Sequence, residues 1–185
     1  MIGNRAMEMA AMNIDPVRLA HRFAETNVLV VDDDIAMRKV ARAMLMSIGV
    51  RVMREAPDGP AGLEAVRNHP VDVVILDWEM PGLDGAGFMR MLRSPGTFPK
   101  PAVPVIMLTG HGERSCVVEA IKVGVNEFLL KPVSCKALCE RLISVLFRPR
   151  PMMLKGDYYG PAPRKPTKTI HSDADDAIAN TVMLN

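Results

Sequence analysis

Three consecutive aspartates stand directly after a short apolar run in VLVVDDD, residues 28–34. Two like charges about 4 Å apart repel by roughly 4 kcal/mol at an effective dielectric constant of about 20, so another interaction must offset this crowding. Asp34 is well placed to cap a helix that follows it. Asp32 and Asp33 are then left as carboxylates that a cation could hold together.

Polar residues also follow three later apolar runs. Asp77 follows VDVVIL (71–76), Thr109 follows VPVIML (103–108), and Lys131 follows EFLL (127–130). Each residue alone has an ordinary explanation, such as a turn aspartate or a solvated lysine. Together they suit one chemistry, because clustered carboxylates bind Mg²⁺ and a carboxylate beside such an ion can attack a phosphoryl group. A lysine and a threonine add donors for phosphoryl oxygens. The set predicts an aspartate that accepts phosphoryl groups, with Mg²⁺ as cofactor.

Short apolar runs alternate with helical patterns over residues 28–147, and this alternation predicts how the polar residues are brought together. The expected strands are 28–31, 51–55, 71–76, 103–108 and 127–130, and the expected helices follow each strand, the last over 134–147. Five such units predict an α/β fold whose parallel sheet has helices on both faces. Ligands of these sheets bind at the carboxyl ends of the strands, where the polar residues stand.

Composition restricts the surroundings of the protein. Of its 185 residues 49% are hydrophobic, and the formal net charge of +2 argues neither for nor against nucleic acid. No apolar run approaches the ~20 residues of a membrane span, and three cysteines without a CxxC pair favour a reducing compartment. We expect a cytoplasmic protein with no membrane partner.

Charge and proline divide the chain into a leader (1–27), a patterned region (28–147) and a tail (148–185) that is Pro-rich, basic at first and then acidic. The tail is predicted to be mostly extended or flexible. It could serve solubility alone, or its arginines, Tyr158 and Tyr159 could bind an acidic partner or nucleic acid. We regard nucleic acid as the less favoured partner.

Four motifs in order resemble the receiver domain of bacterial two-component response regulators, the chemotaxis-regulator-like family. They are VLVVDDD followed by Arg38, VVILDWEMPGLDG (73–85), VIMLTGHG (105–112) and FLLKP (128–132). The resemblance covers roughly residues 26–147. It implies a flavodoxin-like, doubly wound sheet of five parallel strands in the order 2-1-3-4-5, with five helices.

The resemblance also implies roles for single residues. Asp77 corresponds to the phosphoacceptor, Asp33 to a direct Mg²⁺ ligand and Asp32 to a ligand acting through water. The backbone carbonyl of Glu79 corresponds to a further ligand. Thr109 and Lys131 correspond to the residues that contact the phosphoryl group, and Pro132 fits the family's cis peptide bond.

A conformational switch is the next implication. As Thr109 moves toward the phosphoryl group, Phe128 is expected to turn inward, although it could equally be a permanent core residue. Glu79 and His111 each lie two positions beyond a motif residue. We expect them to tune dephosphorylation by controlling the access of water, unless both merely face solvent.

No effector-domain pattern follows residue 147, so the expected protein is a stand-alone receiver, which could also be a phosphorelay intermediate. Its partners would be a sensor histidine kinase or a phosphotransfer protein, and a target protein bound by the fourth helix, fifth strand and fifth helix. An aspartyl-phosphate phosphatase of the haloacid dehalogenase type is the enzyme alternative. That family has a second aspartate where this chain has Glu79, so we expect no separate enzymatic activity.

Overall fold

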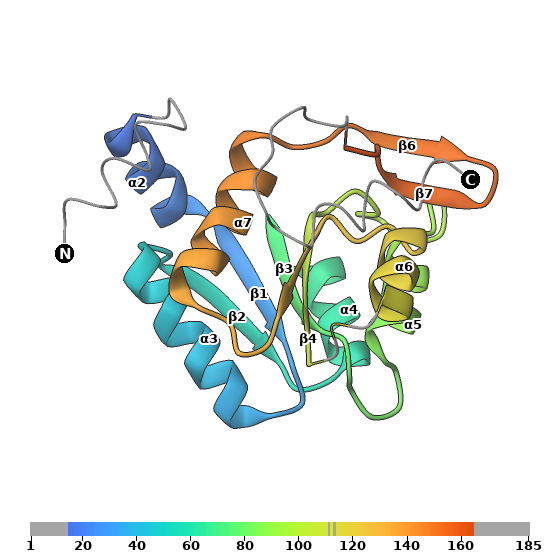
Figure 1. The fold of residues 1–185 in the computed structure, drawn as a ribbon, viewed down its shortest axis with the longest axis horizontal. Coiled ribbons are helices and arrows are strands. Elements are labelled where there is room, and N and C mark those ends of the chain that lie inside the picture. The colour runs from blue at the N-terminus through green and yellow to red at the C-terminus, as the bar shows by residue number, and fades with distance from the viewer. Residues whose placement is uncertain (1–14, 111, 113, 165–185) are drawn as a thin grey trace.

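A five-stranded parallel sheet forms the centre of the computed structural model, which describes residues 15–110, 112 and 114–164 (Figure 1). Its strands are β1 (Asn27–Val31), β2 (Val52–Ala56), β3 (Val73–Asp77), β4 (Val105–Thr109) and β5 (Glu127–Leu130). They lie in the order β2-β1-β3-β4-β5. The predicted flavodoxin-like sheet and its strand order are therefore confirmed.

Helices cover both faces of the sheet (Figure 1). One face carries α2 (Pro16–Glu25), α3 (Ile35–Ile48) and α7 (Cys135–Phe147), and the other carries α4 (Gly59–Asn68), α5 (Gly85–Leu92) and α6 (Arg114–Lys122). Side chains of a strand alternate between faces, so Val28 and Val30 pack into one apolar cluster while Leu29 and Val31 pack into the other. Burial on both faces explains why the strands read as continuous apolar runs.

The helices that follow β1 to β5 are the five predicted ones, and α2 is an addition from the leader. Its Leu19 and Phe23 are buried, and the Phe23 ring meets Phe147 edge-on with centroids 6.5 Å apart. The leader from Pro16 onward is thus part of the packed domain. None of the described helices is long and apolar enough to cross a membrane.

Capping residues fix the start and end of α3. Asp34 accepts a hydrogen bond from the Ala36 amide at 2.7 Å, as the sequence predicts for a helix cap. At the other end Gly49 adopts a left-handed conformation with φ of 113°, which a residue with a side chain rarely takes. Because Asp34 is used in this way, Asp32 and Asp33 remain for the rim of the sheet.

Part of the predicted flexible tail is an ordered hairpin. β6 (Met152–Lys155) and β7 (Tyr158–Pro161) pair antiparallel around the two-residue turn Gly156–Asp157, with Gly156 at φ of 57°. Within the tail that the sequence predicts to be mostly extended or flexible, residues 152–155 and 158–161 are thus two paired, extended strands. An isolated two-stranded hairpin is only marginally stable, and this one packs beside α5 and α6 (Figure 1).

Candidate functional site

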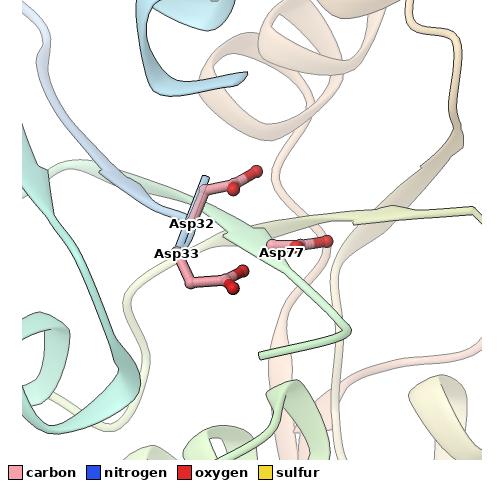
Figure 2. A group of neighbouring side chains, drawn as sticks. All are labelled: Asp32, Asp33 and Asp77. Carbon is pink, nitrogen blue, oxygen red and sulfur yellow. The ribbon is translucent and has the colours of Figure 1, made fainter. Parts of the chain in front are cut away.

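The carboxyl ends of β1 and β3 bring three aspartates together. Val31 is in register with Leu76, so the residues that follow both strands lie at the same level of the sheet. Carboxylate oxygens of Asp32, Asp33 and Asp77 lie within 4.8 Å of one another, and Figure 2 shows the three side chains pointing to the same side. Asp32 and Asp77 are buried, whereas Asp33 is exposed.

Backbone interactions hold the turn that carries two of these acids. The Asp34 amide donates to Oδ1 of Asp32 at 2.9 Å, which fixes this buried carboxylate. Arg38 donates from Nη1 to the carbonyl oxygens of Asp32 and Asp33, at 2.7 and 3.2 Å. Arg38, which the sequence singled out only as part of a motif, thus orients the turn from the first part of α3.

Lys131 is the cation that reaches into this group of acids among the described residues. Its Nζ lies 2.9 Å from Oδ1 of Asp77 and 3.5 Å from Oδ2 of Asp32. The backbone amide of Lys131 donates to the carbonyl of Thr109 at 2.8 Å, which ties the ends of β5 and β4 together. The Lys131–Pro132 bond is cis, as the resemblance implies.

The charges of this site are not balanced within the described residues, because three carboxylates face one ammonium group. Burial raises the pKa of Asp77 above its usual value, the hydrogen bond and charge of Lys131 offset part of that effect, and the nearby charge of Asp32 raises it again. The pKa of Lys131 is also raised, because its contacts with Asp77 and Asp32 outweigh the opposing effect of burial. A further cation would relieve the remaining repulsion.

Thr109 is buried at the end of β4, as the sheet topology predicts. Cys116, on α6, places its Sγ 3.7 Å from the Thr109 hydroxyl. The sequence carries no signal for this contact, because it depends on how α6 packs. Phe128 is half-buried and packs against the apolar cluster under α4, α5 and α6. Glu79 is exposed, and His111 lies outside the described residues.

Comparison with known proteins agrees with this geometry. The family model of the response regulator receiver domain matches residues 28–143. Chemotaxis protein CheY-3 of Vibrio cholerae is 31% identical over 121 residues, which are 65% of this chain and 92% of that protein. The solved structure of the Vibrio cholerae response regulator CheY4 superposes with a TM-score of 0.59 at 30% identity, over 65% of this chain and 98% of that one.

A second solved relative is part of a complex that contains BeF3 and Mg+2. CheY in the CheX–CheY–BeF3–Mg+2 complex of Borrelia burgdorferi superposes with a TM-score of 0.59 at 30% identity, over 65% of this chain and 88% of that one. The chain described here belongs to the response regulator receiver domain family. Its hairpin, residues 152–161, lies beyond the region that the family model matches.

Proposed function

We propose that this protein is a signalling switch that accepts a phosphoryl group on Asp77. The observation that carries the proposal is the meeting of Asp32, Asp33 and Asp77 within 4.8 Å, with the Lys131 ammonium 2.9 Å from Asp77. Membership of the receiver family supports the same interpretation. A structural ion pair alone would not require three acids around one lysine.

The donor set suits Mg²⁺, because it consists of hard oxygen ligands with room for water on the exposed side of Asp33. The carboxylates of Asp32, Asp33 and Asp77 would hold the ion, together with the backbone carbonyl of Glu79. When bound, Mg²⁺ supplies positive charge against the phosphoryl oxygens and the clustered acids.

The chain's own residues perform the transfer in this proposal. An Asp77 oxygen attacks the phosphorus of a phosphohistidine on the donor protein. The new O–P bond forms while the P–N bond to the histidine imidazole breaks, and the electron pair of that bond leaves with the imidazole. An ionised carboxylate needs no general base for this attack. Lys131 and Thr109 then donate to phosphoryl oxygens, which replaces the contact that Lys131 makes with Asp77 here.

The change in the partners of Lys131 and Thr109 links phosphorylation of Asp77 to the surface that binds a target. Phe128 lies on β5, three residues before Lys131, and is only half-buried, so it has space in which to rotate when Thr109 moves. The face formed by α6, β5 and α7 would present this change to a target protein. Glu79 and His111 would set how fast water removes the phosphoryl group.

A histidine kinase or a phosphotransfer protein is the proposed donor, and a protein is the proposed target. The Borrelia burgdorferi relative, solved in complex with CheX, supports a protein partner by analogy. Cys116, Cys135 and Cys139 are free thiols, which fits the reducing cytoplasm where such donors act. The alternative of nucleic-acid binding by the tail gains no support, because Arg150 and Arg164 bind other parts of the chain.

The test is incubation with acetyl phosphate and Mg²⁺, followed by intact-mass measurement. We expect one phosphoryl group on the wild type and none on Asp77→Asn. Asp84→Asn is the matched control, since asparagine caps a helix about as well as aspartate does, and it should be labelled like the wild type. Equal labelling of Asp77→Asn, or no labelling of any protein, would contradict the proposal.

A further inference from the structure

Residues 148–164 bind the amino-terminal end of β5 through two arginines. Arg150 donates from Nη2 to the carbonyl of Asn126 and from Nη1 to the carbonyl of Ala162. Arg164 donates to Oε2 of Glu127. Glu127 is only 5% exposed, and Arg164 adds to the partners that Ser144 and Arg141 of α7 give this buried carboxylate. The segment is therefore bonded specifically to the start of β5.

Arg93, at the end of α5, links the same strand to the neighbouring elements. It is 6% exposed, and it donates to the carbonyls of Val103 and Gly124 and to the side-chain oxygen of Asn126, at 2.8, 3.0 and 2.8 Å. Asn126 thus accepts from Arg93 through its side chain and from Arg150 through its backbone. This residue joins the body of the domain to the C-terminal segment.

Backbone meets backbone where the hairpin touches the turn between α6 and β5. A Cβ atom on Gly160 would lie 2.7 Å from Cα of Gly124, and one on Gly124 would lie 2.7 Å from the carbonyl oxygen of Tyr159. Neither position has room for a side chain. On the outer side, Tyr159 and residues of α5 and α6, Val118 and Lys122 among them, line a groove of about 860 Å³. The hairpin thus contacts the turn that joins α6 to β5.

Both of these elements are connected to the phosphorylation site at their other ends. β5 has only four residues, and Lys131, which contacts Asp77 at 2.9 Å, directly follows it. α6 begins at Arg114, five residues after Thr109. A phosphoryl group adds a charge of about −1.5 to −2 and takes Lys131 as its partner. Close-packed elements respond to such a change as units, so the hairpin is in a position to sense it.

We propose that docking of the hairpin β6–β7 and phosphorylation of Asp77 are coupled in opposite directions. The docked hairpin packs on the turn between α6 and β5 in the arrangement in which Lys131 is bound to Asp77, so it favours the unphosphorylated protein. By linkage, phosphorylation weakens docking to the same degree. This inference rests on the proposed function, and it adds an output that lies outside the region matched by the family model.

Gly160→Val is the variant that tests the coupling, because the added side chain meets the Gly124 backbone and prevents docking while every residue of the five-stranded domain stays unchanged. Gly156→Asn is its matched control. A Cβ atom on Gly156 would meet nothing within 4 Å, and asparagine tolerates its left-handed conformation. Beryllofluoride, which mimics a phosphoryl group bound to a carboxylate, serves as the ligand. Its binding with Mg²⁺ is measured by the fluorescence of Trp78, which stands next to Asp77 in the sequence. Hydrogen exchange of the β6–β7 amides is followed in parallel.

We expect Gly160→Val to bind beryllofluoride about fivefold or more tightly than the wild type, a modest value for coupling between sites. In the wild type, beryllofluoride should speed exchange of the hairpin amides by a similar factor. Gly156→Asn should behave like the wild type in both measurements. Should Gly160→Val fold poorly, Arg150→Met replaces it, with the exposed Arg54→Met as control.

Unchanged affinity in the undocked variant, together with unchanged hairpin exchange in the wild type, would overturn the coupling and leave the proposed function intact. Weaker binding by the undocked variant would overturn its direction. A wild type that shows no response to beryllofluoride and Mg²⁺ would overturn both proposals at once.

Discussion

The two ends of the central sheet solve opposite electrostatic problems. At the carboxyl end, Asp32, Asp33 and Asp77 crowd within 4.8 Å, and one lysine contacts two of them, Asp32 and Asp77. At the amino end, Arg93 is buried and Arg150 is half-buried, and their hydrogen bonds to described residues go to neutral oxygens of the chain itself. The first end has charge left over for a ligand, while the second has used its donors on the fold.

This difference separates residues that are available to bind a ligand from residues that stabilise the fold. A carboxylate that repels its neighbours gains from any cation that arrives, so its environment favours binding. A guanidinium bound to several carbonyls, such as that of Arg93, has few N–H donors left for an added ligand. The predictions below test this division by changing one end at a time.

Arg93→Met should have the largest effect on stability. It leaves the carbonyls of Val103 and Gly124 and the side chain of Asn126 without their buried donor, and each such loss costs about 1–3 kcal/mol. We expect the free energy of unfolding in urea to fall by about 3 kcal/mol or more. Arg54→Met, on the exposed side of β2, should change it little. A loss below about 1 kcal/mol would show that water satisfies these carbonyls.

Mg²⁺ should stabilise the carboxyl end. A ligand present at about 100 times its dissociation constant adds about 2.7 kcal/mol to the stability of a protein that binds it only when folded. We expect thermal unfolding to shift upward with Mg²⁺ and to return to its starting value with a chelator. Asp33→Asn should abolish most of this shift, while Arg150→Met should leave it in place. A shift that survives Asp33→Asn would place the ion elsewhere.

Asp33→Asn should also stabilise the metal-free protein, because it removes one of three mutually repelling charges. Asp33 is exposed and therefore screened by solvent, so the expected gain in urea unfolding without Mg²⁺ is about 1 kcal/mol or less. Asp15→Asn, at an exposed helix cap away from the cluster, is the control. A clear loss of stability would mean that Asp33 makes a structural contact in the metal-free state.

Glu79→Ala should have the smallest effect, a change of a few-fold in the rate at which the phosphorylated protein loses its phosphoryl group. The side chain is exposed at the edge of the site, so its replacement alters the access of water and leaves the acids in place. Decay of acetyl-phosphate-labelled protein after buffer exchange measures the rate. His111→Ala in the same assay tests the other proposed residue. A decay rate equal to that of the wild type in both variants would show that the two residues only face solvent.

The sequence predicted the central sheet well because its signals are local or periodic. Apolar strands and the Asp34 cap each follow from residue type, and parallel topology then places Asp32, Asp33 and Asp77 on one rim. The amino end was not predictable in the same way. The partners of Arg93 and Arg150 are mostly backbone carbonyls, which every residue possesses and no motif reports.

The hairpin is harder to predict from sequence, because the prolines in residues 148–164 favour an extended or flexible segment. Its signal was present: Gly156–Asp157 stands between the apolar MML and the aromatic pair Tyr158 and Tyr159, a recognised hairpin pattern. Pro151 precedes β6 and Pro161 ends β7, where proline does not interrupt pairing. The contact of Cys116 with Thr109 had no signal at all, since it depends on how α6 packs.

The buried Glu127 determines where this protein can be joined to another. The motifs suggest a boundary at Phe147, the end of α7, and a fusion made there would displace Arg164 from a carboxylate that has almost no access to water. Such a hybrid would carry an acid deprived of its nearest arginine at the base of β5, four residues from Lys131. A reporter attached beyond Arg164 leaves that pair in place, and so leaves intact the strand that the reporter is meant to report on.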